Sequence, residues 1–322
     1  MINFKNNPSS AYVRSILELV LAAFLWGASF ILVRWALEDF STSTLIFWRY
    51  LIAFLLGEGF FFLFYREEFK KSHSDRILSA KVGFFLGLSL ILQTHGLHFT
   101  TATNSSFITS MYVILVPVVG AIFFRQKISL GHFLLGFIAF IGMGLLLNLQ
   151  MLSEFKFNGG DLLTLGCALA AAFHIVMVGR TTRLAKSSFR FNNYQNFWTL
   201  VLVMPFLFFE TLQNKISLWP AHVTARSLGS LLGLSIFVSI LGFFLQIRAQ
   251  KYLSTTTASL LCLLEAPFAF SFAILLLNEK INFVQLTGIS IILLSSIFSV
   301  YMDRPKNRNN QDTGPGNCHE PL

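Results

Sequence analysis

Glu265 and Arg49 are charged side chains well inside long apolar segments of the sequence, where a charge needs a partner or water. Glu265 stands about ten residues into one segment, two before Pro267, which interrupts the hydrogen-bond ladder of a helix. Its carboxylate could bind an amino group or carry a proton. The alternative is a protonated or hydrogen-bonded residue that packs helices together. Arg49, about six residues into another segment, could hold a carboxylate through two parallel hydrogen bonds. Its competing roles are structural: an ion pair with Glu38 or Asp39, or folding around a helix end.

Three histidines are further candidates. His174 aligns with Ser29 at an offset of 145 residues, so the two polar groups should lie at equivalent depth and could share a cavity. His174 could contact a ligand or a proton, although a lone buried histidine is more often a hydrogen-bonded packing residue. His95 and His98 lie three apart on one helical face, where they could line an outer gate or bond at the membrane interface. No acidic or thiol ligand stands at a suitable spacing, so we expect no metal site.

Hydroxyl and amide side chains gather where two apolar segments begin. The stretch Thr-Ala-Thr-Asn-Ser-Ser at 101–106 returns 153 residues later as Ser-Thr-Thr-Thr-Ala-Ser at 254–259. The first turn of a helix has unpaired N–H groups that attract anions such as a carboxylate. Ordinary helix capping with small residues for close packing is the alternative. The candidates for ligand contact here are Asn104, Ser105, Thr256 and Ser259.

Two aromatic residues complete the candidate site. Trp26 precedes Gly27, and the pair could form a stacking wall beside a point of close helix approach. In a chain with 37 Phe residues, a core or lipid-facing aromatic is the competing interpretation. Tyr112 is the counterpart of Glu265 at the offset of 153 residues, so we expect it at the same depth in the first half.

The segments that carry these residues have the composition of membrane spans. Of the 322 residues 54% are apolar and 12% are charged, against about 25% charged in soluble domains. About 20 helical residues cross the ~30 Å hydrocarbon layer. The first segment is too long for the apolar region of a cleaved signal peptide, so it should remain in the mature protein. We predict ten spans, at 16–37, 43–64, 82–99, 102–124, 128–149, 159–180, 193–210, 225–249, 255–277 and 281–302.

The two halves of the chain are copies of one unit. After its polar cluster each copy continues through a proline, a Gln-Lys or Glu-Lys pair and a glycine: Pro117, Gln126-Lys127 and Gly136, then Pro267, Glu279-Lys280 and Gly288. Because five spans is an odd number, two tandem copies must cross the membrane in opposite directions. We therefore predict an all-α integral membrane fold of ten transmembrane helices in two inverted five-helix repeats, at 16–149 and 159–302. Residues 1–15 form the N-terminus, 150–158 a linker and 303–322 a disordered tail.

The placement of Lys and Arg predicts orientation, because basic loops stay on the cytoplasmic side. With a cytoplasmic N-terminus, 18 of the 24 basic residues fall in cytoplasmic segments, and both termini are cytoplasmic. Arg34 and Arg49 lie within spans. The net charge of +9 follows from this excess of Lys and Arg in the cytoplasmic segments, where anionic lipid headgroups attract basic residues. Dispersed basic residues without a binding motif argue against nucleic acid as a partner. The basic residues on the other side are Lys156, Lys215, Arg226 and Lys280.

A set of short motifs, in this order and duplicated, resembles the EamA-type members of the drug/metabolite transporter superfamily. They are the run at 24–30, Phe47-Trp48-Arg49-Tyr50, the two Thr/Ser-rich openings, and Leu264-Glu265-Ala266-Pro267 with Asn278-Glu279-Lys280. The resemblance covers about 15–149 and 159–302. It implies ten helices, cytoplasmic termini and a bacterial inner (cytoplasmic) membrane. It also implies export or exchange of small metabolites, commonly amino acids, with nucleotide sugars and drugs handled by relatives. Gln126 departs from the pattern where the second half has Glu279.

Two classes of function follow. The first is a secondary carrier that exports small amphipathic zwitterions by alternating access, because Glu265 and Arg49 offer one charge of each sign. A proton or a counter-substrate could be coupled. Its nearest alternative is an uptake or exchange carrier for a nucleoside-derived metabolite. The second class is a non-transporting accessory protein or an intramembrane enzyme. A hydrolase needs a nucleophile beside its base, whereas Glu265, His174 and Arg49 fall on three different spans. We expect no enzymatic activity, and no cofactor, because no nucleotide or metal-binding motif occurs.

Overall fold

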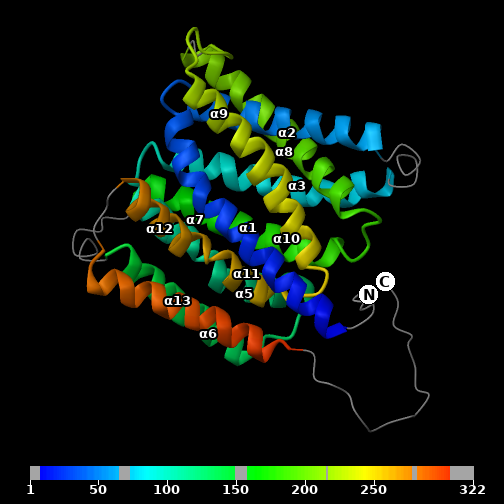
Figure 1. The fold of residues 1–322 in the computed structure, drawn as a ribbon, viewed down its shortest axis with the longest axis vertical. Helices are drawn as coiled ribbons and strands as arrows, with labels where there is room; N and C mark the ends of the chain where they lie inside the picture. The colour runs from blue at the N-terminus through cyan, green and yellow to red at the C-terminus, as the bar shows by residue number, and fades with distance from the viewer. Residues whose placement is uncertain (1–7, 65–72, 149–157, 215–216, 278–280, 305–322) are drawn as a thin grey trace.

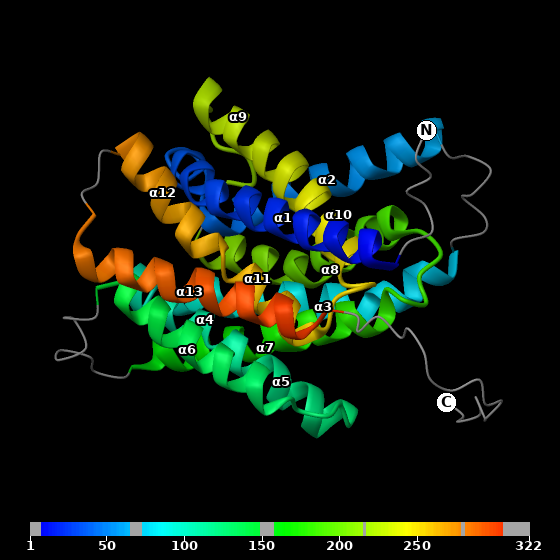
Figure 2. The ribbon, with the colours of Figure 1, turned by 60° about the horizontal axis from the view of Figure 1, so that its bottom comes forward.

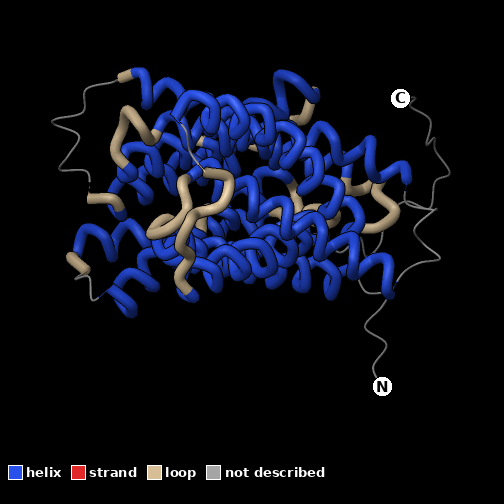
Figure 3. The backbone as a smooth tube through the Cα atoms, turned by 90° about the horizontal axis from the view of Figure 1, so that it is seen from above, coloured by secondary structure: helices blue, strands red, loops and turns tan. Residues whose placement is uncertain are grey.

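The chain folds into helices that run roughly along one direction, as Figure 1 shows. The computed structural model describes residues 8–64, 73–148, 158–214, 217–277 and 281–304, and no strand occurs among them (Figure 3). The helices are α1 (Pro8–Ala36), α2 (Thr42–Phe64), α3 (His73–Gly96), α4 (Ala102–Ser110), α5 (Tyr112–Phe124), α6 (Leu130–Leu146), α7 (Gly159–Thr181), α8 (Ser188–Asn214), α9 (Ala225–Gly233), the π-helix η3 (Leu234–Gly242), α10 (Phe243–Ala249), α11 (Thr255–Cys262), α12 (Glu265–Leu277) and α13 (Phe283–Met302).

These helices make a multi-pass membrane protein. Within the described ranges nine helical segments are long and apolar enough to cross a membrane, and α6 is a shorter apolar helix of 17 residues. At 1.5 Å per residue α6 is about 25 Å long. It matches the fifth predicted span. The all-α membrane fold is thus confirmed, while the count of ten crossings stays a prediction. Of the predicted segments, the tail beyond Arg304, the linker before Asn158 and the pair Glu279-Lys280 lie outside the described residues.

The third and seventh spans differ from their predicted bounds. Helix α3 begins at His73 rather than 82, and α8 runs from Ser188 to Asn214 rather than from 193 to 210. Polar residues in the added first turns are paired with the other half of the chain. The carboxylate of Asp75 accepts hydrogen bonds from the backbone N–H groups of Lys186 (3.0 Å) and Ser187 (2.9 Å). The guanidinium of Arg190 pairs with Glu58 of α2 at 2.5 Å.

Two spans are broken at matching positions. The fourth is interrupted at Met111, between α4 and α5, and the ninth at residues 263–264, between α11 and α12. Near each break the backbone tightens to bonds between residues three apart, as from the N–H of Leu264 to the C=O of Leu261. Pro117 and Pro267 follow the breaks and lack the N–H that would continue the ladder. The breaks place Tyr112 and Glu265 at the first positions of their second half-helices.

The helices of the two halves interleave. Helix α3 packs against α7 and α8, while the segment α9–α10 packs against α1 and α2 (Figures 1 and 2). Helices α6 and α13 lie side by side at one edge of the bundle. The two sets of contacts are equivalent. If each helix is replaced by its counterpart in the other half, the packing of α3 against α7 and α8 becomes the packing of α9–α10 against α1 and α2. They support the inverted-repeat layout, which remains an expectation.

One glycine contact holds the α6–α13 pair together. A Cβ built on Gly288 would lie 2.5 Å from the carbonyl oxygen of Gly142, and one on Gly142 would lie 3.0 Å from the carbonyl oxygen of Gly288. Only glycine permits this approach of two backbones. The repeat-mate of Gly288, Gly136, instead faces the carbonyl oxygen of Val113 at 3.2 Å from an added Cβ.

Hydrogen bonds between helix ends and loops define two ends of the bundle. At the end where α1 begins, the Tyr12 hydroxyl donates to the carbonyl of Val300, and Asp303 accepts from the backbone N–H of Ser254. We call it the basic end, because Arg125, Lys127, Arg180, Arg183 and Arg248 lie there, at the ends of α5, α7 and α10.

Carboxylates also tie the loops at the opposite end. Asp39 accepts from the backbone N–H and the hydroxyl of Thr224, both at 2.8 Å, and Asp161 accepts from the hydroxyl of Thr100 at 2.6 Å. The backbone hydrogen bond from Thr224, with further bonds from the Ser227 and Thr224 hydroxyls, lowers the pKa of Asp39.

Candidate functional site

Glu265 lies at the break between α11 and α12, half-buried, with its carboxylate free of hydrogen bonds and ion pairs to the described part of the chain. Tyr112 lies at the matching break between α4 and α5, and α11, which ends just before Glu265, packs against α5. The hydroxyl of Tyr112 is buried and has no partner among the described residues. The predicted repeat-mates Glu265 and Tyr112 thus lie at the breaks of two spans that pack together.

Helix α1 touches α12 at Glu265. A Cβ added to Gly27 would lie 2.9 Å from the carbonyl oxygen of Glu265 and 2.6 Å from the Cβ of Phe268. The predicted point of close approach is therefore present. Trp26 beside it belongs to the hydrophobic core, and its ring centroid lies 5.3 Å from that of Phe243. This is the packing role that the sequence also allowed.

The π-helix η3 and the first residue of α10 connect three of the predicted residues. Phe243 meets Trp26 and also the ring of His174, at 5.8 Å between centroids. Ser239, four residues earlier, accepts a hydrogen bond of 2.8 Å from the Nε of Arg49. The side chains of Trp26, Arg49 and His174, from α1, α2 and α7, therefore converge on residues 239–243. π-helices occur frequently at functional sites.

Arg49 does not form the ion pair considered from the sequence. Glu38 pairs instead with Arg226 at 3.5 Å, and Asp39 accepts from Thr224. The half-buried guanidinium of Arg49 donates to the hydroxyl of Ser239 and forms no ion pair with a carboxylate of the described chain. Its terminal nitrogens remain able to bind a ligand carboxylate.

His174 and Ser29 each have a protein partner. The Nε2 of His174 lies 3.3 Å from the side-chain oxygen of Gln195, and His174 is 4% exposed. The hydroxyl of Ser29 donates to the carbonyl of Trp26 at 2.7 Å. These bonds agree with a packing role, and His174 also lies beside Phe243, the first residue of α10.

Buried asparagines on α8 belong to the same neighbourhood, and the sequence analysis missed them. The side-chain nitrogen of Asn192 donates to the carbonyls of Ser239 (3.1 Å) and Ile240 (2.9 Å), and that of Asn196 reaches Ser239 at 3.4 Å. Their side-chain oxygens are buried without a partner among the described residues. Two asparagines four apart inside an apolar span were the signal that could have revealed them.

The polar openings of the fourth and ninth spans lie at opposite ends. Thr101 caps α4 by accepting from the N–H of Asn104 at 3.1 Å, and Ser254 caps α11 in the same way. Asp161 is next to the first opening, and Gly179 contacts Thr255 at the second. These points on α7 are 18 residues, about 27 Å, apart. Asn104 and Ser105 are therefore not in one site with Thr256 and Ser259.

The two histidines of the predicted gate lie at the end opposite the basic end. His95 is in the last turn of α3, with its ring 4.4 Å from that of Phe206, and His98 is exposed in the turn that follows, 6.2 Å from His95 between ring centroids. Among the described residues, no group of three or more His, Cys, Asp or Glu side chains could hold a metal ion.

Comparisons with known proteins cover most of the chain. The EamA-like transporter family matches residues 13–148 and 158–301. A protein of Archaeoglobus fulgidus named an uncharacterized transporter is 32% identical over 286 residues, covering 87% of this chain and 84% of that protein. A second one, of the same name and organism, is 25% identical over 286 residues, covering 88% and 95%. A solved chain described only as a crystal structure of a protein superposes with a TM-score of 0.71 at 12% identity, covering 90% of this chain and 97% of the other. That likeness concerns the fold alone.

Proposed function

The chain belongs to the EamA-like transporter family, and from this premise we propose that it exports small amphipathic zwitterions, such as amino acids, by alternating access. The observation that carries the proposal is Glu265, an unpaired carboxylate at a break in a membrane helix. An ionisable group at that depth is costly unless it serves a ligand, a proton or water. Its carboxylate would bind the ammonium group of the substrate.

Arg49 would bind the carboxylate of the same substrate. Two contacts support this pairing: the backbone of Glu265 adjoins Gly27 of α1, next to Trp26, and Arg49 bonds to Ser239 on η3, four residues before the Phe243 that contacts Trp26. A zwitterion satisfies both charges at once, whereas a purely cationic or anionic ligand leaves one of them uncompensated.

The breaks in the fourth and ninth spans would act as hinges. Discontinuous helices at corresponding positions of two repeats are typical of secondary transporters, whose halves rock around a central site. Glu265 and Tyr112 lie at these hinges, so a bound ligand or proton would act directly on the moving parts. We further propose that the basic end faces the cytoplasm of a bacterial inner membrane, because basic loops are retained there.

One observation favours a second candidate function. Trp26 and Phe243 form an aromatic pair beside His174, and nucleobases stack on such rings. An uptake or exchange carrier for a nucleoside-derived metabolite would use this pair. A non-transporting accessory role is the remaining alternative.

A thermal-shift screen of the purified protein against neutral amino acids and nucleosides tests the substrate class. A ligand at about 100 times its Kd adds ~2.7 kcal/mol to the stability of the folded state. We expect a dose-dependent rise in Tm with amino acids that is lost in Glu265→Gln and Arg49→Lys. The matched controls are Glu38→Gln and Arg226→Lys, which alter an exposed pair at one end. A shift with nucleosides alone would favour the second candidate and contradict the first.

A further inference from the structure

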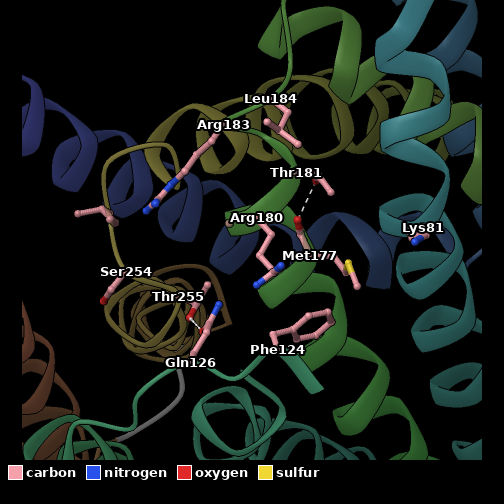
Figure 4. Close-up of a pocket in the computed structure, with 12 residues that line it drawn as sticks. Lys81, Phe124, Gln126, Met177, Arg180, Thr181, Arg183, Leu184, Ser254 and Thr255 are labelled. Carbon is pink, nitrogen blue, oxygen red and sulfur yellow. Dashed lines mark hydrogen bonds between the residues drawn. The ribbon is translucent and has the colours of Figure 1, made fainter. Parts of the chain in front are cut away.

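A cationic pocket opens at the basic end, away from the candidate site. It has a volume of about 600 Å³ and lies between α3, the ends of α5 and α7, and the start of α11 (Figure 4). Its polar lining comes from Lys81, Gln126, Arg180, Thr181, Arg183, Ser254 and Thr255.

The charge of this pocket is uncompensated. Lys81, Arg180 and Arg183 line it, no acidic residue does, and none of the three forms an ion pair within the described part of the chain. The guanidinium of Arg180 is held over the ring of Phe124, 4.8 Å from its centroid. The start of α11 adds the positive end of a helix dipole. The pocket is therefore suited to an anion such as a phosphate.

An apolar groove continues from the cationic pocket. The groove has a volume of about 640 Å³ and runs between α3, α7 and α8, where Phe84, Phe85, Trp198, Leu202 and Pro205 line it. Lys81 and Met177 line both cavities, so the two are contiguous. A ligand that fits both has a charged head and an apolar body.

The order of the two cavities matches the layers of a membrane. Helix α3 enters from the basic end at His73, so Lys81 is about 12 Å and Phe85 about 18 Å along its axis. The charged part of the combined cavity is thus nearer the surface and the apolar part nearer the hydrocarbon core. A free anion would make no use of the groove.

We propose that an anionic phospholipid binds here, with its phosphate in the pocket that Lys81, Arg180 and Arg183 line and an acyl chain in the groove beside Phe84 and Trp198. The basic residues at the end of α7 have another explanation that needs no lipid. Basic loops are retained on the cytoplasmic side of a membrane, and the C-terminal end of a helix favours positive charge. The test must therefore separate this pocket from basic charge in general.

Native mass spectrometry of the full chain, titrated with phosphatidylglycerol or phosphatidylcholine, supplies that test. The variant Arg180→Gln/Arg183→Gln removes two charges from the pocket. Lys127→Gln/Lys186→Gln removes two exposed charges at the same end that line neither cavity. We expect phosphatidylglycerol to bind more tightly than phosphatidylcholine. This preference should fall by about twenty-five-fold in the first variant, since each of the two basic residues near an anionic headgroup contributes roughly fivefold, and it should persist in the second. Equal losses in both variants, or none in either, would overturn the proposal.

Two further measurements separate a lipid from a free anion. Phosphatidylglycerol brominated on its acyl chain should quench the fluorescence of Trp198, compared with a Trp198→Phe variant, and Phe84→Ala should weaken lipid binding without changing Tm in the absence of lipid. Inorganic phosphate serves as the soluble probe. If phosphate displaces the lipid at comparable concentration and Phe84→Ala has no effect, the pocket is a soluble-anion site and the lipid proposal is wrong.

Discussion

Glu265 and Arg49 differ in the hydrogen bonds that they form with the rest of the protein. Arg49 has one hydrogen bond, to Ser239, that fixes the direction of its guanidinium, whereas Glu265 has no partner in the described chain. Arg49 is therefore a donor in a fixed position that would orient one end of a ligand. Glu265 is an acceptor without a partner, and it would bind and release the other end of the same ligand. The sequence indicated both residues because charges are rare in apolar segments. It could not indicate that Arg49 would meet Ser239, 190 residues away, since such a contact depends on how the two halves pack.

A second carboxylate, Asp39, gives a prediction at the residue scale. Hydrogen bonds from Thr224 and Ser227 lower its pKa in the folded state. Asp39 therefore stabilises the fold at pH values above its ordinary pKa of about 3.9, and this contribution is lost as pH falls through the lowered value. We expect Asp39→Asn to reduce Tm by a few degrees at pH 7 and to flatten the dependence of Tm on pH below about 4. Thermal unfolding monitored between pH 3 and 7 provides the check.

The neighbouring residue supplies the control for Asp39. Glu38 is exposed and pairs with Arg226, which is also exposed, so Glu38→Gln should leave Tm almost unchanged. An equal loss of Tm in both variants, with no change in the acid dependence, would show that the Asp39–Thr224 contact does not hold the α1–α2 and α8–α9 loops together.

Among the elements, α1 and α12 define the position of Glu265. We expect Gly27→Ala to destabilise the protein by about 1–3 kcal/mol, because an added Cβ would lie 2.6 Å from the Cβ of Phe268 and 2.8 Å from the backbone nitrogen of Ala269. The clash should also separate α1 from α12 and weaken ligand binding. Thermal unfolding and a ligand titration of the purified variant measure the two effects.

Gly229→Ala is the matched control for Gly27→Ala. Gly229 is also helical, and nothing lies within 4 Å of its added Cβ. Alanine there should be neutral or stabilise the helix by up to ~1 kcal/mol. If Gly27→Ala behaves like Gly229→Ala, the close contact of α1 with α12 is not required.

The sequence predicted elements better than it predicted their ends. Apolar runs located nearly all the spans, and Pro267 indicated the interruption near Glu265, whereas the matching break near Tyr112 was not predicted. The starts of α3 and α8 were placed too late, because Asp75 and Arg190 are polar and their partners in the other half cannot be read from local composition. The asparagines of α8 were missed although they are four residues apart, because their partners Ser239 and Ile240 lie more than 40 residues further along the chain.

At the scale of the whole molecule, the two ends differ in charge. The structure gathers Arg125, Lys127, Arg180, Arg183 and Arg248 at one end, although they come from both halves. If that end is cytoplasmic, cysteines introduced at Lys127 or Arg183 should be protected in intact cells from a membrane-impermeant thiol reagent. Cysteines at His98 or Ser217, at the other end, should react. These variants are made after replacing Cys318, and labelling after membrane disruption is the control. The reverse pattern would invert our proposed orientation.

The duplication itself could be predicted from the repeated motifs, and its interleaved packing could not. Nothing in the sequence indicates that α3 lies between α7 and α8, or that α1 lies against α9–α10. The site depends on this interleaving, because Trp26 and Arg49 of the first half contact residues 239–243 of the second half, where His174 also contacts Phe243.

Counterflow of radiolabelled neutral amino acids into proteoliposomes is the most direct test of a central zwitterion site. The wild type should accumulate label against preloaded unlabelled amino acid. Glu265→Gln should abolish this uptake at unchanged protein content and Tm, while Glu38→Gln should retain it. Uptake by Glu265→Gln at the wild-type rate would contradict the role of the unpaired carboxylate at the helix break.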